Sequence, residues 1–112
     1  MTNVTRTPPK TITVKTAVLD TSTSGSNELV AAPTGGGAIR VLSLVVVAAA
    51  ANTVKLMSSA TSISGLYALA ANGGLVLPFS EHGWGQCAAN EALNINLSAA
   101  TAVGVTVQYI IL

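Results

Sequence analysis

The sequence predicts an all-β fold, namely a single β-sandwich or jelly-roll-like domain of about eight antiparallel strands that follows an extended N-terminal arm. Two observations lead to this prediction. Short apolar segments alternate with polar residues at a period of two, and turn-forming residues separate them at intervals of about 10–12 residues. A length of 112 residues suits one domain. We therefore expect an arm at residues 1–10 and one domain at residues 11–112.

The first strand is expected in the segment TITVKTAVL, where Ile12, Val14 and Val18 would share one face opposite Thr13 and Lys15. A flexible connection is expected at residues 21–27. Further strands are expected at residues 28–32, 38–47, 52–57, 61–70 (with a break at Gly65), 75–79, 91–98 and 103–112. Two of these strands alternate clearly, with inward residues Leu93, Ile95 and Leu97 in one and Val103, Val105, Val107, Tyr109 and Ile111 in the other.

The segment 38–47 is almost continuously hydrophobic and rich in β-branched residues, which is typical of a buried central strand. The apolar run VLSLVVVAAAA, bounded by Arg40 and Asn52, is far shorter than the ~20 residues that a membrane-spanning helix needs. Its alanines, in the segment AAAAN at 48–52, predict a tight bend between two strands.

Charged residues are scarce, with five basic and four acidic side chains and a net charge of +1. Such a chain stays in solution through Thr, Ser, Asn and Gly, and we expect it to hide part of its surface against other subunits. The few basic and aromatic residues argue against nucleic acid as a partner. A single Cys excludes an internal disulfide. The polar N-terminus, which contains two prolines, is unlike a signal peptide, so we expect no membrane partner.

The only His, Trp and Cys of the chain lie together in PFSEHGWGQC, residues 78–87. Glu81 and His82 are adjacent and would point to opposite faces of a strand, so they could not both bind one metal ion. A Cys87–His82 nucleophile pair would need an orienting residue and an oxyanion hole, which the loop does not supply. We therefore predict no catalytic residue, no metal site and no cofactor. Trp84 is expected to plug an end of the sandwich or to contact a neighbour, and Cys87 to begin a strand as a small apolar residue.

Two further segments have a structural and a functional interpretation. The glycine run at 34–37 lacks the Lys-Ser/Thr pair and the helix of a phosphate-binding loop, so a flexible hairpin loop is favoured. The arm is either a disordered terminus or an extended segment that lies on a partner or adds a strand to a neighbour. The functional interpretation is favoured. The candidate interface residues are Arg6, Pro8, Pro9, Lys10 and Trp84.

Four stretches carry a resemblance to a known family: LVAAPTGGGAIRVLSLVVVAAA, TSISGLYALAANGGLVLPF, GWGQCAANEALNINLS and VGVTVQYIIL. In their order and spacing, from about Leu29 to Leu112, they resemble the head decoration or cement proteins of tailed bacteriophages. The resemblance implies a small β-sandwich that is made in the host bacterial cytoplasm and binds the capsid exterior of the virion. It implies two partners, the major capsid protein and further copies of the chain, as a trimer in preference to a dimer. Where this chain has Cys87, the family tends to have small hydroxyl residues, so no role for the thiol is implied.

The leading functional hypothesis is therefore a structural virion protein that bridges major capsid subunits and stabilises the shell without chemistry. The alternative is a virion binding module, such as a head-fibre base or a tail or receptor-binding component. An enzyme ranks third. The outward polar residues of the last strands have two interpretations, as an ordinary solvent-facing surface or as wet contacts with neighbours, and they are Asn94, Asn96, Thr106 and Gln108.

Overall fold

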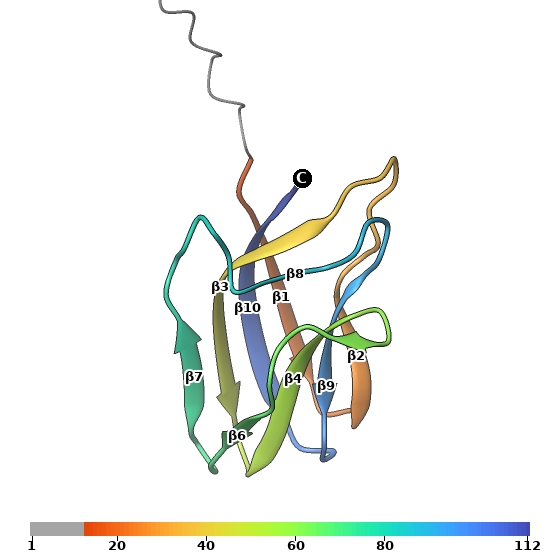
Figure 1. The fold of residues 1–112 in the computed structure, drawn as a ribbon. Helices are drawn as coiled ribbons and strands as arrows, with labels where there is room; N and C mark the ends of the chain where they lie inside the picture. Colours follow the sequence, from red (N-terminus) through yellow and green to blue (C-terminus); the bar gives the residue numbers. More distant parts are fainter. Residues whose placement is uncertain (1–12) are drawn as a thin grey trace, which may run out of the picture.

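The structure, a computed structural model, describes residues 13–112 and shows an all-β chain in which this part contains no helix. Its strands form two antiparallel five-stranded sheets (Figure 1). Sheet A contains β1 (Lys15–Thr21), β10 (Val103–Ile111), β3 (Ile39–Ala48), β7 (Gly74–Leu77) and β8 (Gly85–Gln86). Sheet B contains β2 (Gly25–Val30), β9 (Leu93–Leu97), β4 (Asn52–Ser58), β5 (Thr61–Ser62) and β6 (Tyr67–Leu69). The predicted arm at residues 1–10 lies outside the described residues. The described part contains no helix that is long and apolar enough to span a membrane.

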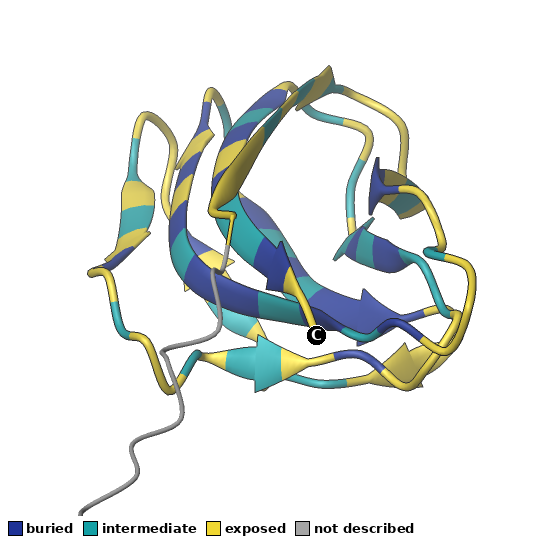
Figure 2. Cartoon of the chain, turned by 90° about the horizontal axis from the view of Figure 1, so that it is seen from above, coloured by how far each residue is buried: buried dark blue, intermediate teal, exposed yellow. Residues whose placement is uncertain are grey.

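The two sheets enclose one hydrophobic core in a sandwich-like arrangement, to which strands of both sheets contribute buried side chains. The predicted alternation of β9 is confirmed, because Leu93, Ile95 and Leu97 are each at most 1% exposed. Buried and exposed positions alternate along the strands in the same way in Figure 2. Period-two patterning therefore defines the inward face of this strand, as expected for an antiparallel sheet with one covered face.

The inward face of β1 differs from the prediction. Val14 and Val18 are exposed, and Ala17 and Leu19 pack against the core instead. The reason is the register with β10, in which Ala17 and Leu19 lie opposite two buried valines, and directly opposite residues share a face. Ile12 lies outside the described residues. The predicted connection at 21–27 is shorter than expected, because β2 already begins at Gly25.

A bulge in the central strand β3 changes which of its residues face inward. Val41 pairs with Tyr109 and Ser43 pairs with Gln108, so Leu42 is the extra residue. Ile39 and Val41 face the core before the bulge, and the even-numbered residues Leu44, Val46 and Ala48 face it afterwards.

The prediction for β10 fails at its last residue, because Ile111 at the strand end is exposed and Ile110 is buried.

The lower end of the core, where β4 begins, is closed by one buried polar side chain. The expected bend in the alanine segment is present and leads into Asn52, which is 5% exposed. The Asn52 amide donates to the Ala99 carbonyl and the Thr101 hydroxyl, at 3.0 and 2.9 Å. Its carbonyl oxygen accepts from the Ala99 amide and the Ser98 hydroxyl, each at 3.1 Å. All these bonds join β4 to the connection between β9 and β10.

We expect Asn52→Ala to lower the free energy of unfolding by about 2–3 kcal/mol, because it leaves several buried polar groups without partners. The matched control is Asn94→Ala, since Asn94 makes one exposed bond, to the Ser59 carbonyl at 3.2 Å. That control should cost about 0.5 kcal/mol. Urea unfolding of the three proteins measures the difference, and equal losses in both variants would contradict the role given to Asn52.

Candidate interaction surface

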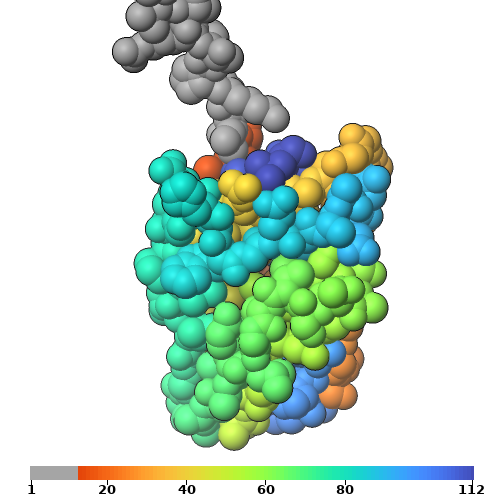
Figure 3. Space-filling view, viewed as in Figure 1, coloured from red at the N-terminus to blue at the C-terminus, as the bar shows by residue number. Residues whose placement is uncertain are grey.

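The segment that holds the rare residues is an interruption in an edge strand. β7 pairs with the second half of β3, and β8 pairs with Arg40 and Val41 near its start. Between them, the amide of Ser80 donates to the Leu42 carbonyl at 2.9 Å and the amide of Trp84 donates to the Val41 carbonyl at 2.8 Å. The chain thus follows β3 throughout, and residues 78–84 form an inserted loop opposite the bulge at Leu42. We call residues 78–84 the aromatic loop. This segment crosses the upper part of the surface in Figure 3.

Arg40 fixes the position of the aromatic loop. Its Nε donates to Gln86 Oε1 at 3.1 Å, and its Nη1 donates to the Glu81 carbonyl at 3.5 Å. Gly83 has a φ of +84°, and a Cβ atom there would lie 2.6 Å from Cγ of Arg40. The close approach of the arginine stem therefore requires glycine at this position, for both space and backbone conformation.

The aromatic loop covers part of the outer face of sheet A and forms a pocket of about 390 Å³, which we call the upper pocket. Its floor is apolar, because Leu42 and Ile110 are 2% and 3% exposed although they lie outside the main core cluster. The residues around this floor are Val14, Phe79, Arg40, Glu81 and His82. An apolar floor beneath a few charged side chains is typical of a site that holds an apolar group of a partner.

The prediction that Glu81 and His82 point to opposite faces assumed a strand, whereas the two residues lie in a turn, and both line the upper pocket. Within residues 13–112, no three His, Cys, Asp or Glu side chains come together in a group that could hold a metal ion. Glu81 and His82 therefore border the upper pocket, and among the described residues no third side chain that could bind a metal ion joins them.

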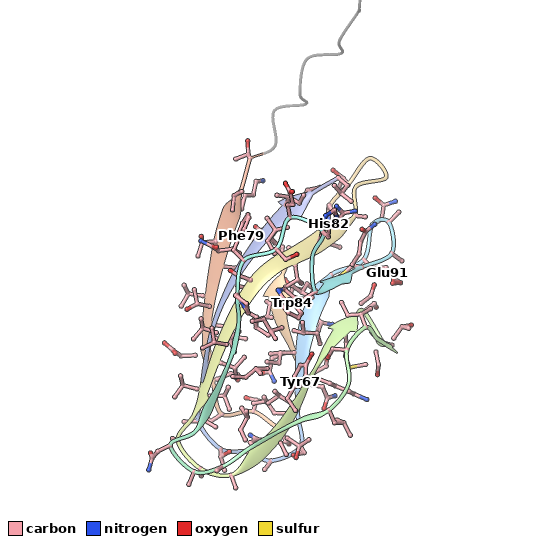
Figure 4. All side chains as sticks on the ribbon, turned by 60° about the vertical axis from the view of Figure 1, so that its left-hand side comes forward. Tyr67, Phe79, His82, Trp84 and Glu91 are labelled. Carbon is pink, nitrogen blue, oxygen red and sulfur yellow. The ribbon has the colours of Figure 1, made fainter. Side chains whose placement is uncertain are left out.

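The aromatic loop exposes two large rings. The Trp84 indole Nε1 donates to the Pro78 carbonyl and is hydrogen-bonded within the loop, at 2.6 Å. The Trp84 side chain is 42% exposed, so it does not plug the sandwich as one interpretation predicted. Phe79 is 58% exposed and lies well apart from Trp84 in Figure 4. Phe79 is not among the interface residues predicted from the sequence. The sequence feature that indicates an exposed ring here is a large apolar residue directly after Pro78, in a segment rich in turn-forming residues.

Cys87 is buried and belongs to a different cluster from His82. It follows β8 and does not begin a strand, which corrects the prediction, and it lines a pocket on the sheet B side with Ser58 and Glu91. The Ser58 hydroxyl donates to Glu91 Oε1 at 2.6 Å and accepts from the Ala88 amide at 2.9 Å. Burial raises the pKa of the Cys87 thiol, a hydrogen bond with Ser58 lowers it, and the nearby Glu91 carboxylate raises it further. The thiol is held in its neutral, poorly nucleophilic form.

The outer faces of the two sheets differ in polarity. One row across sheet A consists of Val18, Thr106, Val45 and Val76, and the next row consists of Asp20, Gly104, Val47 and Gly74. Two rows across sheet B consist of Ser26, Asn96 and Lys55 and of Glu28, Asn94 and Met57. All four outward valines of sheet A are exposed, by 40% to 68%. We call these four valines, with Thr106 and Gly104 between them, the valine face.

Part of the valine face comes from the hydrophobic run at residues 38–47, which predicts a buried central strand. β3 is central in sheet A, as predicted, but Val45 and Val47 are exposed, which contradicts its prediction as a buried strand. Continuous apolar runs are typical of strands that are covered on both faces. In this strand one of the two faces is open, so Val45 and Val47 form part of an exposed apolar surface.

Of the predicted interface residues, Trp84 is exposed on the aromatic loop, whereas Arg6, Pro8, Pro9 and Lys10 lie outside the described residues. No family model matches the chain, and no curated protein matches it either. The resemblance to cement proteins therefore stays an expectation from the sequence.

The raised pKa of Cys87 predicts a loss of stability at alkaline pH. Above the ordinary thiol pKa of about 8.5, the unfolded chain loses this proton before the folded protein does. The stabilisation is complete below that pH and is lost as the pH rises toward the raised pKa, by up to about 1.4 kcal/mol per pH unit. Urea unfolding should show a smaller alkaline loss in Cys87→Ala, and identical pH profiles would contradict the assigned burial effect.

Proposed function

We propose that this protein is a structural virion protein that binds the outer surface of a phage capsid, bridges major capsid subunits and stabilises the shell. One observation carries the proposal: a charge-poor, sandwich-like domain exposes two aromatic rings on the aromatic loop, and one of them, Phe79, borders an apolar pocket on the outer face of sheet A. Such a surface works by burial and shape complementarity. In this function the protein has no catalytic role and needs no cofactor, and its location is the capsid exterior.

We infer a jelly-roll as the finer description of the fold. The order β1-β10-β3-β7 in one sheet and β2-β9-β4-β5 in the other supports it. β5 and β6 both pair with β4, and β7 and β8 both pair with β3, so ten strand segments occupy eight strand positions. The edge position next to β3 is the one that the aromatic loop interrupts.

The aromatic loop supplies the contact in this proposal. Phe79 and Trp84 are the anchors, because large rings at the centre of an interface contribute most to binding when they become fully buried. An apolar side chain of the capsid protein enters the upper pocket above Leu42 and Ile110, and Arg40, Glu81 and His82 form its polar surroundings. Several copies in one oligomer then bind neighbouring subunits together, so that modest contacts give a stable attachment by effective concentration.

We expect Phe79→Ala and Trp84→Ala each to weaken binding to purified expanded heads that lack the protein, by about 2 kcal/mol or more. Co-sedimentation with the heads at increasing protein concentration measures the affinity. The matched control is Leu66→Ala, because Leu66 is 68% exposed but lies in the connection between β5 and β6. Unchanged binding of both aromatic variants would overturn the assigned contact, and no binding of the unaltered protein would overturn the function.

The alternative, a head-fibre base or a tail or receptor-binding component, uses the same exposed rings for a different partner. The number of copies in a purified particle separates the two functions. A decoration protein occupies every equivalent site on the capsid lattice and is abundant, whereas a tail or fibre component is present in a few copies. Quantitative mass spectrometry of the particle measures this number.

A further inference from the structure

We propose that the valine face is the contact between two copies of this chain, related by a two-fold axis that runs along the strands between β10 and β3. This inference does not depend on capsid binding, because it concerns the free protein, and its two-fold symmetry differs from the trimer that the resemblance to cement proteins favours. The surface is the valine face, and the molecule that covers it is a second copy of the chain.

The shape of the valine face supports the pairing of two copies. In the row nearer the lower end, Val47 stands between Gly104 on β10 and Gly74 on β7, so a projecting side chain has a glycine on either side. In the neighbouring row, Val45 stands between Thr106 and Val76. The face thus has a projection at Val47 and a depression at Gly104 on adjacent strands. A surface with both features side by side can fit a copy of itself.

A two-fold axis between β10 and β3 brings these features together. The rotation places β10 of one copy over β3 of the other and β1 over β7, while each row stays at its own height. Val47 of each copy then lies over Gly104 of the other. In the adjacent row, Val45 lies over Thr106 and Val18 lies over Val76. Every contact occurs twice, and each projection meets a depression or another apolar side chain.

The depression at Gly104 belongs to a larger open hollow of about 690 Å³ at this end of sheet A. Asp20, Val47 and Gly104 line one part of it, and the connections between the strands, including Ala49, Asn72 and Ala102, line the rest. A valine side chain from a second copy fills part of this space. The position is also sterically defined, since a Cβ atom on Gly104 would lie 3.2 Å from Oδ1 of Asp20.

The charges of the face are compatible with this pairing. Asp20 is the only charged residue in the two rows, and it lies on the edge strand β1. Under the two-fold rotation, the two Asp20 carboxylates lie at opposite margins of the contact, each over Gly74 of the other copy. The like charges are thus separated by the width of the sheet and stay at the solvent-exposed rim. The polar outer rows of sheet B offer no such surface.

The size of the face sets the strength of the contact. Four strands about 4.8 Å apart, over the roughly 13 Å that the four residues of β7 span, give a face of roughly 250 Å² per copy, about a third of the ~800 Å² of a standard stable interface. We therefore expect a reversible dimer whose population rises with protein concentration. The two sheets should pack in the aligned manner, with their mean strand directions within about 30° of each other.

The test exchanges projection and depression. Val47→Gly removes the projection and Gly104→Val fills the depression, so each single variant should weaken dimerisation about ten-fold or more, since each change acts twice. The double variant restores the fit, because the valine on β10 now meets the glycine on β3 of the other copy. Sedimentation equilibrium from micromolar to millimolar protein measures the dissociation constants, and the double variant should return to within about three-fold of the unaltered protein.

Leu66→Ala serves as the control and should leave the dissociation constant unchanged, because Leu66 lies outside sheet A. Circular dichroism and the urea midpoint show that each variant is folded, and the double variant provides the decisive comparison if a single variant is unstable. A protein that stays monomeric at every concentration overturns the proposal. So does a double variant that dimerises no better than the single ones.

Discussion

The bulge at Leu42 in β3 is the constraint on which the arrangement of the surface depends. β3 pairs with β10 on one side and with β7 and β8 on the other, so an extra residue in β3 affects both neighbours. On the β10 side it shifts the register, and on the other side the edge strand opens into the aromatic loop. The same bulge turns Leu42 outward, where the loop and Ile110 bury it. The core, the loop and the upper pocket therefore have one common origin.

Much of the strand pattern could be predicted from the sequence, because local alternation determines which residues can share a face. β9 and the bend before Asn52 follow the prediction for this reason. The inward face of β1 could not be predicted, since Val18 and Leu19 are both apolar and only pairing with β10, far away in the sequence, selects Leu19. The register shift at Leu42 is equally non-local. Sequence alone shows a hydrophobic run there and not which residue is unpaired.

The cluster of rare residues shows how proximity in sequence differs from proximity in chemistry. His82 and Cys87 are five positions apart, but His82 borders the upper pocket and Cys87 lies beside Ser58 and Glu91. The chain turns at Gly83 and then pairs with β3, which sends the thiol inward. The carboxylate of Glu91 is used in a hydrogen bond with Ser58. The polar residues of this region therefore connect loops to strands, and the exposed part of the region is aromatic.

The two proposed contacts both lie on the outer face of sheet A, and the two-fold axis brings the upper pockets of the two copies opposite each other. A two-fold axis along the strands keeps the same end of both copies together, so the two aromatic loops lie at one end of the dimer. A partner surface with repeated subunits can then be bound at two points at once, and the second contact forms at high effective concentration. A weak dimer becomes more populated on such a surface, because binding brings two copies together and thereby raises their local concentration. Under the two proposals, this coupling lets a small, charge-poor domain with modest individual contacts attach firmly to a repeating lattice.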